Sequence, residues 1–124
     1  MITLRAGSPR DHERLIRLRD NVLRNGNFDP TVIDSAAKTA PELFTRGTLS
    51  IEFFECDSRE IIVAEVGQQP IGWAVVQLES GHRAFIFIEY TDISNKVADR
   101  IITRAEEIAN AEGVSSLLAI VFRG

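Results

Sequence analysis

Glu89 and Tyr90 end the apolar run that begins at Ala84 in this 124-residue chain, and both side chains are of types that could take part in acid–base chemistry. A carboxylate can accept a proton and a tyrosine hydroxyl can donate one. The neighbouring Ile86 and Ile88 would raise the pKa of the Glu89 carboxyl if they exclude water from it. Structural interpretations stay open for both residues: a solvated carboxylate at a strand end, and an aromatic cap on a sheet.

Ser94, Asn95 and Lys96 stand immediately before a helical pattern and have two interpretations. Ser or Asn at such a position caps a helix by accepting a hydrogen bond from a backbone amide. The same amides, the positive end of the helix dipole and the Lys96 charge can also hold a phosphate group. The residues alone leave both interpretations open.

The other reactive side chains lack partners at a useful spacing. His12 and His82 have polar neighbours and no cluster of further Cys or His residues, so we expect surface residues and no metal site. Cys56 is the only cysteine, so it cannot form an internal disulfide, and it lies in no nucleophile signature. We therefore expect neither metal nor thiol chemistry, and a cytoplasmic protein.

The composition is that of a globular chain, with 44% apolar and 26% charged residues. Lys and Arg number 14 against 18 Asp and Glu, a net charge of -4 that disfavours nucleic acid and anionic membranes as partners. No apolar stretch resembles a signal peptide or a membrane span. A chain of this length supports one core, so we expect one domain over residues 1–124.

The first half of the chain predicts a strand followed by helices. Residues 2–5 alternate as in a strand, and Ser8 then begins a helix that ends at Asn25. One face of this helix is mostly apolar, with Arg19 the exception, and its residues recur at the three- and four-residue spacing of a helix: Leu15, Ile16, Leu18, Arg19, Val22 and Leu23. Residues 29–37 predict a second helix. Residues 42–56 fit a broken helix or a short strand, with a slight preference for helix.

From residue 59 onward the pattern changes to that of strands. The segments 61–66, 70–78 and 84–90 are rich in β-branched residues and separated by short turns, which predicts a three-strand antiparallel meander. Apolar residues on both faces of these strands favour a sheet covered by helices on each side. Trp73, on the middle strand, belongs to the core or to a dimer contact.

The last two predicted elements are a helix and a strand. An apolar stripe from Val97 to Ala109 predicts a helix that Gly113 ends. Residues 114–121 predict a strand parallel to the one that ends near Tyr90, since strand–helix–strand connections favour parallel, right-handed pairing.

This order of elements resembles the GNAT superfamily of acetyl-CoA-dependent N-acetyltransferases. Three stretches carry the resemblance: residues 2–11, residues 62–76, and residues 96–113 followed by 115–121. It implies an α/β (α+β) fold with a mixed central sheet, ordered strand, two helices, three-strand meander, helix and strand, and truncated after the fifth strand. Residues 1–124 would form a single GNAT-like domain.

The resemblance implies transfer of an acetyl group from acetyl-CoA to a primary amine of a small molecule or peptide. Glu89 would accept the amine proton, and Tyr90 could protonate the departing thiolate. The acetyl-CoA contacts that the resemblance implies lie at the end of the fourth strand and the start of the next helix: Phe87, Ile88, Ile93, Ser94, Asn95, Lys96, Val97 and Ala98.

The sequence departs from the family pattern in two places. The family's phosphate loop places Gln or Arg, Gly, and then Gly or Ala where this chain has Ile93, Lys96 and Ala98, so only Ala98 matches. Family members also continue past the fifth strand, and without that continuation residues 117–121 would be uncovered, which predicts a homodimer. These departures favour the alternative function, a non-catalytic GNAT-like binding module that acts as a homodimer.

Overall fold

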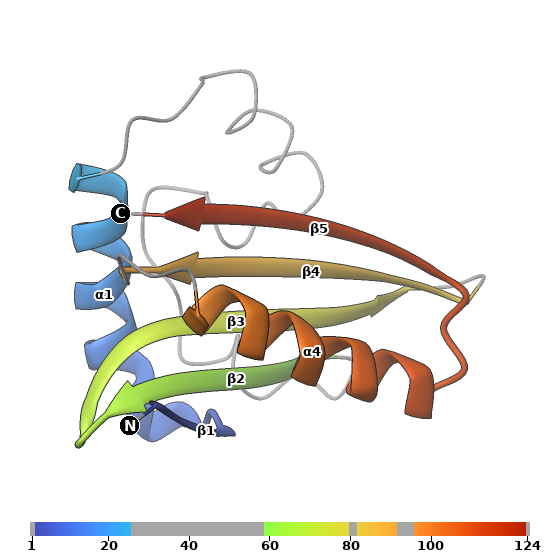
Figure 1. Cartoon of the computed structure of the whole chain (residues 1–124), viewed down its shortest axis with the longest axis horizontal. Helices are drawn as coiled ribbons and strands as arrows, with labels where there is room; N and C mark the ends of the chain where they lie inside the picture. The colour runs from blue at the N-terminus through green and yellow to red at the C-terminus, as the bar shows by residue number, and fades with distance from the viewer. Residues whose placement is uncertain (1, 26–58, 80–81, 92–95, 124) are drawn as a thin grey trace.

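The computed structural model describes residues 2–25, 59–79, 82–91 and 96–123. Five strands form one sheet in the order β1-β2-β3-β4-β5, antiparallel except for the parallel β4–β5 pair (Figure 1). The strands are β1 (Ile2–Ala6), β2 (Arg59–Val66), β3 (Gln69–Glu79), β4 (Arg83–Tyr90) and β5 (Ser116–Arg123). The helices are a 3-10 turn (Pro9–Asp11), α1 (His12–Asn25) and α4 (Lys96–Ala111).

The predicted mixed sheet, the meander, the first and last helices and the parallel fifth strand are therefore confirmed. Turn chemistry accounts for two of the boundaries, because Gly67 (φ 64°) and Gly113 (φ 73°) adopt left-handed conformations that glycine tolerates well. The helix predicted at 29–37 and the segment 42–56 lie outside the described residues.

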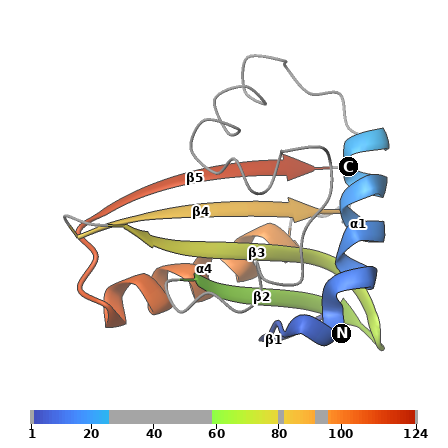
Figure 2. The same ribbon diagram turned by 180° about the vertical axis from the view of Figure 1, so that it is seen from behind.

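The two helices cover opposite faces of the sheet. Figure 1 shows α4 in front of the strands, and the view from behind in Figure 2 shows α1 crossing the sheet near the ends of β4 and β5. The faces follow from strand alternation, since neighbouring residues along a strand point to opposite sides. On the α4 face the core contains Ala74, Ile86, Ile88, Val97 and Ile101, among others.

Close packing of α4 on the sheet depends on Gly72 in β3. A Cβ at this position would lie 2.8 Å from Val97 Cγ1 and 3.1 Å from Tyr90 Cβ. Distances this short would force neighbouring atoms to move. Glycine therefore lets the first turn of α4 approach the middle of the sheet.

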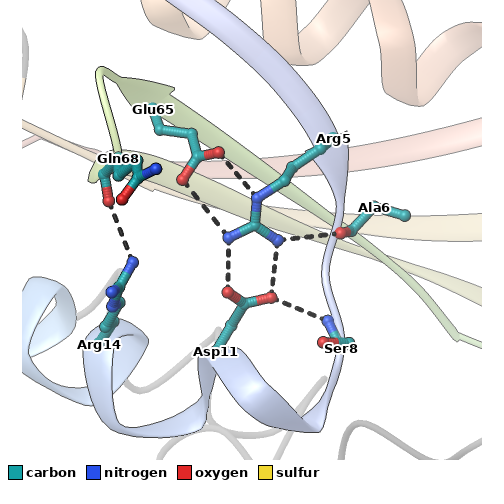
Figure 3. A network of polar contacts seen from close by, with 7 residues as sticks. All are labelled: Arg5, Ala6, Ser8, Asp11, Arg14, Glu65 and Gln68. Atoms are coloured by element: carbon teal, nitrogen blue, oxygen red, sulfur yellow. Dashed lines mark hydrogen bonds and ion pairs between the residues drawn. The ribbon is translucent and has the colours of Figure 1, made fainter.

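The start of α1 is fixed by a charged network around Arg5 (Figure 3). The Arg5 guanidinium donates to Asp11 in a fork, with Nη1–Oδ2 at 2.8 Å and Nη2–Oδ1 at 2.5 Å, and its Nε donates to Glu65 Oε1 at 2.8 Å. Asp11 also accepts a hydrogen bond of 3.0 Å from the Ser8 amide, so its carboxylate satisfies an amide at the start of the helix. This network joins β1, β2 and the first turn that leads into α1.

β4 and β5 stay paired along their whole length. The register runs from Arg83↔Ser116 to Tyr90↔Arg123. Among the described side chains of β5, three large apolar ones are exposed: Leu117 (42%), Leu118 (54%) and Val121 (41%).

Candidate functional site

Glu89 is the second-last residue of β4 and lies on the α1 face of the sheet. Its side chain is fully buried, at 0% exposed, so the interpretation of a solvated carboxylate is wrong. Tyr90, the next residue, belongs to the core on the α4 face and is 5% exposed. Because alternation turns them to opposite faces, the structure does not bring the two predicted acid–base residues together.

The two carboxyl oxygens of Glu89 differ in their hydrogen bonding to the described residues. Trp73, its cross-strand partner on β3, donates from Nε1 to Glu89 Oε1 at 2.8 Å. The Trp73 ring also packs edge-on against Phe87, with the ring centroids 6.1 Å apart. Within the described part of the chain, Glu89 Oε2 is buried and accepts no hydrogen bond. A buried acceptor without a donor is unfavourable and is rare in folded proteins.

Burial raises the pKa of Glu89 to about 7, against the opposing effects of the Arg19 charge and the Trp73 hydrogen bond. Arg19 comes from α1, where it stands among the apolar stripe residues and is only 2% exposed. Burial lowers the pKa of Arg19, and attraction to Glu89 opposes that effect. Helix α1 thus places the Arg19 cation near the Glu89 carboxyl. With a pKa of about 7, this carboxyl can exchange a proton near neutral pH.

A cleft of about 610 Å³ lies between α1, the β2–β3 turn and the residue that follows β4. Its walls consist of Arg14, Arg17, Leu18, Asn21, residues 68–71 and Thr91. The Thr91 amide and hydroxyl both donate to the Ile71 carbonyl, at 2.9 and 3.2 Å, which closes the base of the cleft. Leu18 precedes Arg19 in α1, and Thr91 follows Glu89 by two residues, but neither Arg19 nor Glu89 is among the described residues that line the cleft.

The predicted acetyl-CoA residues fall into three groups. Phe87 and Ile88 are fully buried on opposite faces of β4. In α4, Lys96 is exposed at the first position, whereas Val97 and Ala98 point into the core. The remaining three, Ile93, Ser94 and Asn95, lie outside the described residues.

Arg19 and Trp73 are the site residues that sequence reasoning did not assign. Trp73 was expected in the core or a dimer contact, and it is a core residue that also orients Glu89. The signal for Arg19 was its place in the apolar stripe of α1, where a charged residue is unusual. Among the described residues no group of His, Cys, Asp or Glu could hold a metal ion, and no helix is long and apolar enough to cross a membrane.

Solved structures that share this fold include acetyltransferases, one of them of the GNAT family, so the chain has the GNAT fold. One is the GNAT-family acetyltransferase from Streptococcus pneumoniae, with a TM-score of 0.70 and 15% identity over 92% of this chain and 70% of that one. Another is the PaiA N-acetyltransferase from Thermoplasma acidophilum in complex with coenzyme A, with a TM-score of 0.65 and 17% identity over 92% of this chain and 75% of that one. A third is an aminoglycoside acetyltransferase from an uncultured soil metagenomic sample in complex with sisomicin, with a TM-score of 0.61 and 16% identity over 96% of this chain and 76% of that one. No family model and no curated protein matches the sequence.

Proposed function

We propose that the chain is an N-acetyltransferase that moves an acetyl group from acetyl-CoA to a primary amine, with Glu89 as the proton acceptor. The observation that carries this proposal is the buried carboxyl itself: Trp73 holds Oε1, Oε2 accepts no hydrogen bond from the described residues, and the pKa is about 7. A carboxylate of this pKa is suited to remove a proton from an amine near neutral pH. A base with an ordinary pKa would be much weaker.

The chemistry needs one proton acceptor and one proton donor. The amine nitrogen forms a bond to the acetyl carbonyl carbon, and the carbon–sulfur bond of the thioester breaks. Glu89 takes the proton that the amine loses, directly or through one water molecule, and the CoA thiolate takes a proton from solvent. Tyr90 stays a packing residue in this scheme, because its side chain belongs to the core on the α4 face.

The co-substrate would bind at the end of β4 and the start of α4. The pyrophosphate would lie on the amides of residues 93–98 with Lys96 beside it, since helix N-termini attract phosphate. Pantetheine would follow β4 along Phe87 and Ile88, and the final β4–β5 pairs at Glu89 and Tyr90 must separate to admit it, because their backbone groups are already paired.

Isothermal titration of the purified protein with acetyl-CoA and with CoA tests the proposal. We expect micromolar binding, followed by thiol release when primary amines are supplied. Glu89→Gln should retain acetyl-CoA affinity and lose at least tenfold in kcat/KM for the amine. Unchanged thiol release by this variant would remove Glu89 from the chemistry.

The continuous β4–β5 pairing favours a second function, a non-catalytic module with the GNAT fold. This module would keep the strands closed and show no heat with acetyl-CoA or CoA at high concentration. A partner protein captured by pull-down would then be its ligand. The same titration therefore separates the two functions.

A homodimer through β5 is part of this proposal. β5 is the outermost strand at its side of the described sheet, and Leu117, Leu118 and Val121 are all more than 40% exposed. Exposed apolar side chains on an edge strand favour association with another edge, and a second copy supplies the same surface. Light scattering should show twice the chain mass, and Leu118→Lys should shift it to the single-chain mass. A monomeric parent protein would refute this part.

A further inference from the structure

Positively charged side chains line the cleft between α1 and the β2–β3 turn, although the chain carries a net negative charge. Arg14 and Arg17 lie one turn apart on the same side of α1, and both line the cleft. Among the described residues that line it, none is acidic, and the other polar members are amide and hydroxyl side chains. Because the chain has a net charge of -4, this local excess of two cations is not a general property of its surface.

Arg14 is held in position at the rim of the cleft. Its Nη1 donates to the Gln68 carbonyl at 3.1 Å, which ties the helix to the β2–β3 turn (Figure 3). In the same view Asp11 points toward Arg5, with which it forms the fork, rather than toward Arg14. Arg17 makes no hydrogen bond or ion pair with the described residues, and it is exposed. The two guanidinium groups thus retain N–H donors for an anion.

Two residues that line the cleft, Thr91 after β4 and Leu18 on α1, lie close in sequence to Glu89 and Arg19. Thr91 lines the cleft and lies two residues after Glu89, a distance of about 7 Å along a strand. Leu18 lines the cleft and precedes Arg19 on α1. A small molecule in the cleft can therefore place one group on Arg14 and Arg17 and another at Thr91, two residues along the chain from Glu89.

We infer that the cleft binds a small primary amine that also carries an anionic group, either a carboxylate or a phosphate. The anionic group is held by Arg14 and Arg17, and the amine points toward Glu89. This substrate class rests on the proposed acetyl transfer, because it names the acceptor of that reaction. A polycationic amine is disfavoured, since two guanidinium groups and no described acidic residue line the cleft.

Matched ligands without acetyl-CoA test this inference. We would titrate the protein with propylamine, β-alanine, O-phosphoethanolamine and 1,4-diaminobutane by calorimetry. Fluorescence of Trp73, the only tryptophan, reports whether binding occurs near Glu89. We expect β-alanine or O-phosphoethanolamine to bind at least tenfold more tightly than propylamine, and the diamine to bind most weakly. The tighter of the two anions identifies whether the site takes carboxylate or phosphate.

Arginine variants supply the control. Arg17→Gln should reduce the preference for the anionic amine by about tenfold, because one charge-assisted hydrogen bond is lost. Arg104→Gln changes an exposed arginine on α4 and should leave the preference unchanged. Equal affinity for propylamine and the anionic amines, an unchanged preference in Arg17→Gln, or no binding of any amine would overturn the inference.

The outcome is separable from that of the proposed function. Arginine-dependent binding of the anionic amine, in a protein that gives no heat with acetyl-CoA, would keep the cleft as an anion site and refute the transferase. Acetylation of propylamine and β-alanine with equal kcat/KM would support the transferase and refute the anion site.

Discussion

The buried Glu89 carboxyl should make the protein less stable as the pH rises through neutrality. Its pKa is about 7 in the folded chain and 4.5 when the group is unperturbed. Between these values the folded chain holds the proton and the unfolded chain has released it, so the free energy of unfolding falls with rising pH. At about 1.4 kcal/mol per pH unit, the complete effect is about 3 kcal/mol, reached above pH 7.

Glu89→Gln isolates this effect because the amide does not ionise. Its oxygen can still accept from Trp73 Nε1, and any constant difference in packing cancels when one pH is compared with another. We expect the free energy of unfolding of Glu89→Gln, relative to the parent, to increase by about 2.5 kcal/mol between pH 5 and pH 8, because part of the complete effect is already present at pH 5. Urea denaturation followed by circular dichroism at half-unit pH steps measures it.

Glu107→Gln is the matched control for this series. Glu107 is 59% exposed in its pair with Arg104, so the difference from the parent should stay within about 0.5 kcal/mol at every pH. If the Glu89→Gln difference is equally flat from pH 5 to pH 8, the carboxyl ionises normally and the argument from its burial fails.

Three further perturbations test other parts of the structure. Asp11→Ala removes the fork with Arg5 and the Ser8 amide contact and should lower the free energy of unfolding by about 2 kcal/mol at pH 7. The pKa of Asp11 is lowered, chiefly by Arg5, so this loss should shrink as the pH falls from about 4 through the lowered pKa; a loss that persists below the lowered pKa would point to packing instead. Gly72→Ala should lower the free energy of unfolding by about 1–3 kcal/mol, measured by urea, and an unchanged value would contradict the close approach of α4. Lys96→Glu should weaken CoA binding at least tenfold in calorimetry without changing the melting temperature, and equal affinity would remove the loop from the proposed site.

The parts of the fold that were predicted from sequence depend on local patterns. Alternating β-branched residues define β2 to β4, and a helical stripe followed by Gly113 defines α4. The parallel pairing of β5 follows from the handedness of a strand–helix–strand connection. Each of these signals lies within one element or one connection, which is why the sequence alone contains it.

The site depends on distant contacts, and most of it was not predictable. Arg19 and Glu89 are 70 positions apart in sequence, and only the tertiary packing of α1 across the end of β4 couples them. Trp73 contacts Glu89 because the register of β3 and β4 pairs the two residues. A shift of one residue in that register would turn the side chains of one strand to the other face of the sheet. Sequence alone could identify the candidate carboxylate but not the groups that raise or lower its pKa.

The energetics of Glu89 argue against a purely structural role. An ionised, buried carboxyl destabilises the fold near pH 8, and its second oxygen lacks a donor among the described residues. A neutral side chain that accepts from Trp73 would serve packing better. Groups that reduce stability in this way are concentrated at functional sites, where the perturbed pKa is used.

Ionisation of Glu89 should affect both the stability and the activity of the protein. If Glu89 is the base, kcat/KM for the amine should increase with pH through about 7, because only the carboxylate can accept a proton. Glu89→Gln should then be the more stable protein at pH 8 and the poorer enzyme. A variant that is both more stable and equally active would show that the chain tolerates a costly carboxyl without using it for proton transfer, and the transferase would need another base.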